Sequence, residues 1–203
     1  LPILSSEFNE LKKKFLEREF SSLNKPQLEA VFKLNGNLLV LAGAGSGKTT
    51  VIINRIYNML IYGDAYNTDF NCDKEIYDKL SKGFETGKNL SDFSKLLNLN
   101  PVLPEHILAI TFTNKASKEI KKRLASKIGK DAEKIWASTF HSMCARILRS
   151  NAGLIGYTPS FTIYDADDQK RLIKECEKNF NIDENFSSTL NKVYAQTNIE
   201  LAE

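Results

Sequence analysis

The chain has 203 residues, of which 42% are hydrophobic and 26% charged, and a formal net charge of +3. This is enough apolar material for one α/β domain and part of another, and too much for a disordered chain. Three scattered cysteines and two histidines argue against a zinc site or a disulfide framework, and the sequence shows neither a membrane span nor a signal peptide, so we expect a cytoplasmic protein without a membrane partner.

The first two predicted elements are helices. Residues 7–20 place Phe8, Leu11 and Phe15 on one helical stripe, and residues 25–34 form a second helix with Asn24 as its expected cap.

An apolar run over residues 37–41 predicts the first core strand, and a glycine-rich loop follows it. The loop reads Ala42, Gly43, Ala44, Gly45, Ser46, Gly47, Lys48 and Thr49, which is the Walker A pattern with Ala42 in place of the first glycine. Glycines let several backbone N–H groups face one anion, and a helix over 48–62 directs its positive end to the same point. The sequence therefore predicts a nucleotide site, with Lys48 on the β- and γ-phosphates and the Thr49 hydroxyl on Mg²⁺.

Residues 64–104 interrupt this order with asparagines, glycines and prolines between short apolar stretches. We interpret them as an inserted surface segment with small helices around 76–84 and 91–97. Their apolar side chains are expected to form a local core of their own, peripheral to the site.

Regular alternation then returns. Strands are predicted at 106–111 and 134–138, each followed by a helix, at 114–128 and 140–150. This order predicts a parallel sheet with helices on both faces. Beyond residue 153 the pattern becomes helical and acidic, with helices at 166–180 and from about 186, so we place a boundary near 151–160.

Charge is concentrated in one part of the chain. Residues 111–150 carry 10 basic and 3 acidic side chains, a net +7, whereas residues 1–110 are neutral. A local basic excess is typical of a partner with a phosphate backbone, although a solvated helix face explains it equally simply.

Aromatic and small polar residues follow both of the later strands, where a doubly wound sheet binds its ligands. They are Phe112, Thr113, Asn114 and Lys115 after the first, and Thr139, Phe140 and His141 after the second. Rings can stack on bases while hydroxyls, amides and lysine bind phosphates, so the pattern fits single-stranded nucleic acid. Taken singly, each phenylalanine is more simply a core side chain, and His141 a structural histidine. Gln27 offers a donor and an acceptor suited to adenine, or is a solvated helix residue.

Taken together and in this order, these segments resemble the UvrD/Rep/PcrA-type superfamily 1 DNA helicases. The resemblance rests on LNKPQLEAV, AGAGSGKTT, AITFTNKASKEIKKRL, ASTFHSMCARILR and FTIYDADDQKRL. Only the first 20 residues and the insertion 64–104 fall outside it.

The resemblance implies a P-loop NTPase (RecA-like) motor domain 1A over residues 1–150 and the start of a helical 1B subdomain over 151–203. It implies ATP and Mg²⁺ as cofactors, with Gln27 at the adenine, 42–49 at the phosphates, and Thr50 and Arg55 near them. The residues after the two later strands would contact single-stranded DNA. The family uses ATP hydrolysis to move 3′ to 5′ and to open duplex at single-strand/double-strand junctions, typically in repair or replication.

One family motif is missing from the sequence. The Walker B strand ending in Asp-Glu is absent, since Asp183 and Glu184 follow a polar stretch. Without these carboxylates and a second, C-terminal motor domain of the same polypeptide, the chain alone is expected to be inactive. An AddA/RecB-like helicase–nuclease and a non-catalytic nucleotide- or DNA-binding module remain open alternatives, and a small-molecule kinase is a weaker one.

Overall fold

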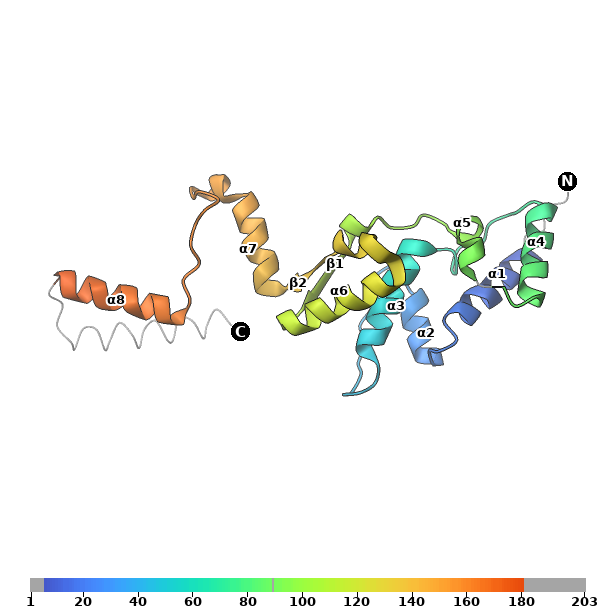
Figure 1. The fold of residues 1–203 in the computed structure, drawn as a ribbon, viewed down its shortest axis with the longest axis horizontal. Helices are drawn as coiled ribbons and strands as arrows, with labels where there is room; N and C mark the ends of the chain where they lie inside the picture. The colour runs from blue at the N-terminus through green and yellow to red at the C-terminus, as the bar shows by residue number, and fades with distance from the viewer. Residues whose placement is uncertain (1–5, 89, 181–203) are drawn as a thin grey trace. The chain divides into compact units, whose positions relative to one another are not determined.

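The computed structural model describes residues 6–88 and 90–180 (Figure 1). Its helices and strands are α1 (Ser6–Glu19), α2 (Lys25–Phe32), α3 (Lys48–Ile61), α4 (Lys74–Glu85), α5 (Ser94–Leu97), β1 (Leu108–Thr111), α6 (Asn114–Ile128), β2 (Trp136–Thr139), α7 (Phe140–Ser150) and α8 (Ala166–Phe180). The chain divides into two units, Leu1–Ala145 and Arg146–Glu203. The predicted helix from 186 and the pair Asp183 and Glu184 lie outside the described residues.

The first unit contains the predicted parallel pair of strands. β1 and β2 run parallel, with Leu108 opposite Trp136 and Thr111 opposite Thr139. Helix α6 runs alongside them in Figure 1, and its buried Ile120 and Leu124 belong to the same apolar cluster as Ala137 of β2. This confirms the parallel pairing.

The prediction of helices on both faces is not met within the described residues. Exposure alternates along β1, where Leu108 and Ile110 are 45% and 47% exposed. Side chains that alternate along a strand point to opposite faces, so one face of β1 carries uncovered apolar side chains.

The predicted strand at 37–41 is wrong for the described part of the chain. These residues form no strand there, and Leu39 and Leu41 are 81% and 87% exposed. A continuous apolar run signals burial between neighbouring strands, and a strand is defined only once such a neighbour pairs with it.

The insertion is closed at its two ends. Leu99 donates its N–H to the Tyr62 carbonyl at 3.0 Å, and its own carbonyl accepts from Asp64 N–H at 2.9 Å. Gly63, between these two, has a φ of 58°, and a side chain there would overlap the Leu99 carbonyl. The chain therefore leaves and re-enters the fold at one point.

The apolar side chains of the insertion do not form a core of their own, which corrects the prediction from sequence. Leu80, Phe93 and Leu97 are buried in the same cluster as α1. The Phe15 ring of α1 lies 5.0 Å from that of Phe84 and 5.7 Å from that of Phe93. Helix α1 is thus the partner against which the apolar side chains of the insertion pack.

The insertion also contacts α2, the helix that precedes the Walker loop. The ring of Tyr66 stacks on that of Phe32 at 3.8 Å, and the Asn67 amide donates to the Phe32 carbonyl at 2.6 Å. These contacts argue against a peripheral segment that could be removed without effect on α2.

Gly83 marks a close contact between α4 and the rest of the insertion. A Cβ at this position would lie 2.7 Å from Cε2 of Phe93. At an open helical site, glycine to alanine is stabilising by roughly 1 kcal/mol, but overpacking typically costs about 1–3 kcal/mol. We therefore expect Gly83→Ala to lower the free energy of unfolding in urea, whereas Lys82→Ala, at an exposed site on the same helix, should not. A more stable Gly83→Ala variant would contradict this packing.

Lys12 of α1 is a buried cation with polar and aromatic partners. Its ammonium donates to Asn9 Oδ1 and to the Thr68 carbonyl, both at 2.7 Å, and lies 4.2 Å from the centre of the Phe70 ring. Burial lowers the pKa of Lys12 to about 8, and the neighbouring charge of Asp69 opposes this shift only in part. The amine joins α1 to the start of the insertion.

This depressed pKa predicts a specific dependence of stability on pH. In the unfolded chain Lys12 titrates at its ordinary pKa of 10.5. Between pH 8 and 10.5 the unfolded state therefore binds more protons, so the contribution of Lys12 to the free energy of unfolding rises with pH. In denaturant unfolding, the free energy of unfolding of the wild type should therefore rise across this window relative to that of Lys12→Met. Parallel curves for the two proteins would contradict the assignment.

The second unit begins within α7 and contains α8. Asp165 precedes α8, and its Oδ1 accepts from the N–H groups of Asp167 and Asp168, both at 2.9 Å. The sequence predicts this cap and the bounds of the helix, and both are confirmed.

Candidate functional site

The Walker loop lies on the surface between residue 41 and α3. Gly45 and Gly47 have φ values of 75° and 85°, in the left-handed region that favours glycine. Ser46 closes the turn by donating its hydroxyl to the Gly43 carbonyl at 2.8 Å. Helix α3 then begins at Lys48, and Val51 N–H bonds back to the Gly47 carbonyl. The N–H groups of Lys48 and Thr49 precede that bond and lack an intrahelical acceptor.

Lys48 adds a positive charge to this helix start. Its ammonium donates to the loop carbonyls of Ala42 and Gly43, at 3.1 and 2.6 Å. The side chain is exposed and touches no core residue through these bonds. A cation held against a helix N-terminus is an arrangement that suits an anionic ligand.

Gln27 connects α2 to the Walker loop. Its side-chain oxygen accepts from Asn24 N–H at 3.0 Å, and Asn24 Oδ1 accepts from Gln27 N–H at 3.1 Å, which makes a reciprocal cap for α2. The amide nitrogen of Gln27 donates to the Ser46 carbonyl at 3.0 Å. Both ends of the amide are thus used within the protein, so contact with adenine, which stays a prediction, requires Gln27 to exchange these bonds.

A cavity of about 240 Å³ lies beside Lys48, between α2 and the loop. Both α2 and the loop contribute apolar and polar residues to its walls. Its lining residues are Asn24, Pro26, Gln27, Ala30, Val40, Leu41, Ala42, Ser46, Lys48 and Val51. An apolar wall next to a phosphate-binding loop provides a surface for a flat ring attached to phosphates.

Thr50 and Arg55, expected near the nucleotide, are not among those lining residues. Arg55 donates from its guanidinium to the Ala30 carbonyl, which joins α3 to α2. Burial lowers the pKa of Arg55 from its ordinary value, although a guanidinium remains charged in proteins. Its position supports the wall of the cavity rather than its opening.

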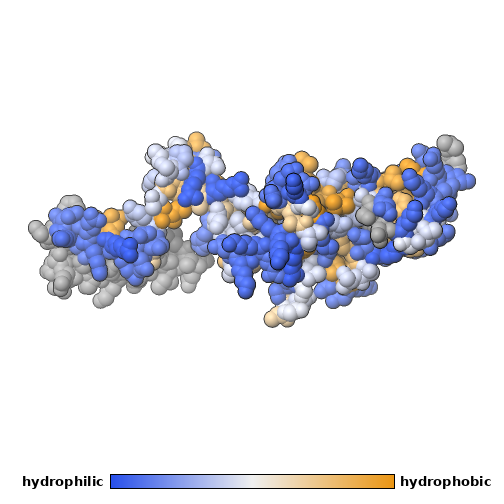
Figure 2. Space-filling model, viewed as in Figure 1, coloured by the Kyte–Doolittle hydropathy of each residue, from blue (hydrophilic) through white to orange (hydrophobic). Residues whose placement is uncertain are grey.

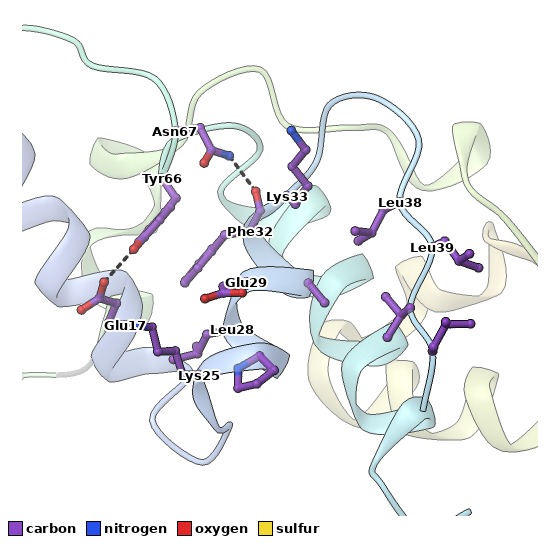
Figure 3. Close-up of a pocket in the computed structure, with 14 residues that line it drawn as sticks. Glu17, Lys25, Leu28, Glu29, Phe32, Lys33, Leu38, Leu39, Tyr66 and Asn67 are labelled. Atoms are coloured by element: carbon purple, nitrogen blue, oxygen red, sulfur yellow. Dashed lines mark hydrogen bonds between the residues drawn. The ribbon is translucent and has the colours of Figure 1, made fainter. Parts of the chain in front are cut away.

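A larger hollow of about 790 Å³ lies between α2 and residues 38–41 (Figure 3). Leu28 and Phe32 of α2 lie on one side, and the segment carrying Leu38 and Leu39 on the other. The residues that line it include none of the loop residues 42–49. Apolar side chains line this groove together with charged ones such as Lys25, Glu29 and Lys33, and it lacks the phosphate-binding loop of the smaller cavity.

The residues after β1 and β2 come together at one edge of the sheet. Thr111 pairs with Thr139, so Phe112 and Phe140 follow directly opposite residues. Phe112 is fully exposed and Phe140 is 58% exposed, with the ring of His141 centred 6.2 Å from that of Phe140. Asn114, Lys115 and His141 are exposed as well. Within the described residues, neither phenylalanine is a core side chain.

Two threonines of this edge act as helix caps. Thr113 Oγ1 accepts from Ala116 N–H at 3.1 Å at the start of α6. Thr139 is buried, and its Oγ1 lies 2.9 Å from Ser142 Oγ and accepts from Ser142 N–H at the start of α7. The positive ends of α6 and α7 therefore lie at the same edge, a role that the spacing of each threonine before its helix could have indicated.

The described residues lack two kinds of feature. No helix there is long and apolar enough to cross a membrane. In that same part of the chain, no group of three or more His, Cys, Asp or Glu side chains is placed to hold a metal ion.

Comparisons with known proteins identify the family. Residues 23–69 and 90–201 match the family described as UvrD/REP helicase N-terminal domain. The chain is 44% identical over 161 residues to the ATP-dependent DNA helicase PcrA of Staphylococcus aureus, and 43% identical over 162 residues to that of Staphylococcus epidermidis. These alignments cover 79% and 80% of the chain but 17% of each relative, so the chain spans less than a fifth of their length.

The parts outside the family match are informative. Helix α1 precedes residue 23 and helix α4 lies between residues 69 and 90, so both fall outside it. These two helices pack on each other and form an accessory element of this chain. The matched residues make up more than half of the sequence, and the chain therefore belongs to the UvrD/REP helicase N-terminal domain family.

Proposed function

We propose that this chain is the ATP-binding part of a DNA helicase, which couples ATP hydrolysis to movement along single-stranded DNA and to duplex opening. The observation that carries the proposal is the exposed Walker loop, with Lys48 at the start of α3 beside the 240 Å³ cavity. The family and the PcrA relatives support the same activity for the whole protein.

The residues present fit ATP with Mg²⁺. The phosphate chain would lie against the loop 42–49, Lys48 and the first turn of α3, with the ring against the apolar wall near Gln27. Thr49 would hold Mg²⁺, which when bound neutralises charge on the phosphate oxygens. The carboxylates that complete such a site are assigned to the rest of the whole protein, since the described residues bring no acidic cluster to it.

The uncovered apolar residues fit a RecA-like sheet that further strands complete. Leu39 and Leu41 beside the Walker loop and Leu108 and Ile110 of β1 are all exposed. We assign the strands that cover them to the rest of the whole protein. Residues 1–150 then form motor domain 1A and residues 151–203 begin 1B.

Single-stranded DNA is assigned to the edge formed by Phe112 and Phe140. Bases would stack on the two rings, while Asn114, Lys115 and His141 contact the backbone or base edges. The resemblance favours 3′-to-5′ movement toward a junction, with the second motor domain of the same polypeptide closing on this edge. A cytoplasmic role in repair or replication follows from the same resemblance.

Strand displacement by the whole protein tests this proposal. We expect ATP and Mg²⁺ to drive release of a strand from a duplex with a 3′ single-stranded tail, and not from one with a 5′ tail. Nucleotide binding without displacement of either substrate would favour a non-catalytic module.

The 203-residue chain alone gives a further expected result. Its sequence shows no Walker B strand that ends in the catalytic carboxylates, so we expect its phosphate release with single-stranded DNA to stay at background. DNA-stimulated turnover by this chain, abolished by Lys48→Ala, would contradict the assignment of the catalytic carboxylates to the rest of the whole protein.

A further inference from the structure

Three lysines form a stripe along the outer face of α6. Lys115, Lys118 and Lys122 are spaced by three and four residues, which places them side by side on a helix. All three are exposed, and the face that packs on the sheet is marked by the buried Ile120 and Leu124. Figure 2 shows the hydrophilic surface that α6 presents in this view.

The charge of this lysine stripe is not neutralised nearby. Glu119 is the only acidic residue of α6, and it is already paired with Arg123. Across the described ranges, no salt bridge joins Lys115, Lys118 or Lys122 to a carboxylate. By contrast α4, also lysine-rich, alternates its lysines with Glu75, Asp78 and Glu85. The stripe is therefore a local positive patch and not a balanced solvated surface.

The lysine stripe begins where the exposed ring of Phe112 ends. Helix α6 starts at Asn114, and Lys115 is its second residue. From Lys115 to Lys122 the helix rises roughly 10 Å, at about 1.5 Å per residue. The stripe is therefore long enough to face more than one phosphate of a strand that leaves Phe112 along α6.

We propose that Lys118 and Lys122 extend the DNA-binding edge along α6 and bind the phosphates next to the base stacked on Phe112. This inference rests on the proposed function, because it takes single-stranded DNA as the ligand. Lysine ammonium groups are compact point charges without the planar fork of arginine, so the contact is independent of base sequence. Phe112 then fixes one base, and the stripe fixes the direction in which the strand leaves it.

The test compares the double variant Lys118→Ala/Lys122→Ala with the wild type in the whole protein, by fluorescence anisotropy with labelled oligothymidine. Alanine is the best helix former, so α6 should be retained. Two lost phosphate contacts should lower the slope of log affinity against log salt by about 1.4, at about 0.7 per contact for single strands. Affinity for a long strand should fall roughly threefold to tenfold at about 0.1 M salt.

Position provides the control. The matched variant Lys79→Ala/Lys82→Ala removes the same charge from exposed positions of α4 and should leave the slope unchanged.

Three other results would each contradict a specific claim. An unchanged slope in Lys118→Ala/Lys122→Ala, with binding still weakened by Phe112→Ala, would overturn the lysine stripe and leave the proposed function intact. An equal loss in the α4 control would show a general effect of net charge and overturn the stripe as well. A wild-type protein that binds no single-stranded DNA would overturn the proposed function itself.

Discussion

Lys48→Ala in the whole protein is expected to weaken ATP binding about tenfold or more and to reduce turnover to near background. A charge-assisted contact with phosphate is worth roughly 1.5–3 kcal/mol, and about 1.4 kcal/mol corresponds to a factor of ten in affinity. Turnover falls further because charge develops on the transferred phosphoryl group in the transition state, where a fixed cation stabilises it most.

The structure makes this variant a clean test. The Lys48 ammonium bonds to the Ala42 and Gly43 carbonyls of the exposed loop, so its removal leaves the core intact. Lys74→Ala removes the same charge from α4, outside the family match, and should change neither quantity. Binding of a fluorescent ATP analogue and steady-state phosphate release report the two effects. Unchanged hydrolysis in Lys48→Ala would withdraw the Walker assignment.

The sequence predicted best those elements whose ends carry local signals. The bounds of α6 and α7 agree with the predicted helices 114–128 and 140–150, because Thr113 and Thr139 cap them at fixed positions. Local hydrogen bonds decide such ends, and the residues that make them are adjacent in the sequence. The exposed Phe112 and the glycine-rich loop follow from equally local chemistry.

Features that depend on distant partners were predicted less well. Residues 37–41 have the composition of a buried strand, yet they pair with no strand in the described part of the chain. The apolar residues of the insertion were recognised, but their contacts are with Phe8 and Phe15 of α1, about 70 residues earlier. Periodicity shows that a face is buried and does not show what covers it.

The sequence predicts which residue types lie at the site, but it does not predict the hydrogen bonds that they make. Gln27 is next to the Walker loop, as a role at the nucleotide requires, but its amide already bonds to Asn24 and Ser46. An amide has donors and an acceptor whichever partner it finds, so sequence alone cannot choose between a cap and a ligand contact. The folded structure shows that this one side chain joins α2 to the loop.

Phe112→Ala is expected to weaken binding of single-stranded DNA and to uncouple ATP use from movement. Stacking of a base on an aromatic side chain is worth roughly 1–3 kcal/mol, which corresponds to a loss of about five- to 150-fold in affinity. The ring is fully exposed in the structure, so its truncation removes nothing from the core. Phe112→Trp keeps a stacking surface and should restore most of the affinity.

The salt dependence of DNA binding distinguishes the contribution of the Phe112 ring from that of the neighbouring Lys115 charge. Stacking is not screened, so the loss in Phe112→Ala should persist as salt rises, whereas the loss in Lys115→Ala should shrink. Leu103→Ala truncates another exposed apolar side chain, which precedes β1 instead of following its carboxyl end, and serves as the control for a general effect of surface apolarity. Anisotropy at two salt concentrations and strand displacement per ATP consumed measure both effects. If Phe112→Ala binds DNA as the wild type does at both salt concentrations, the strand lies elsewhere, and the edge formed by the ends of β1 and β2 is not its site.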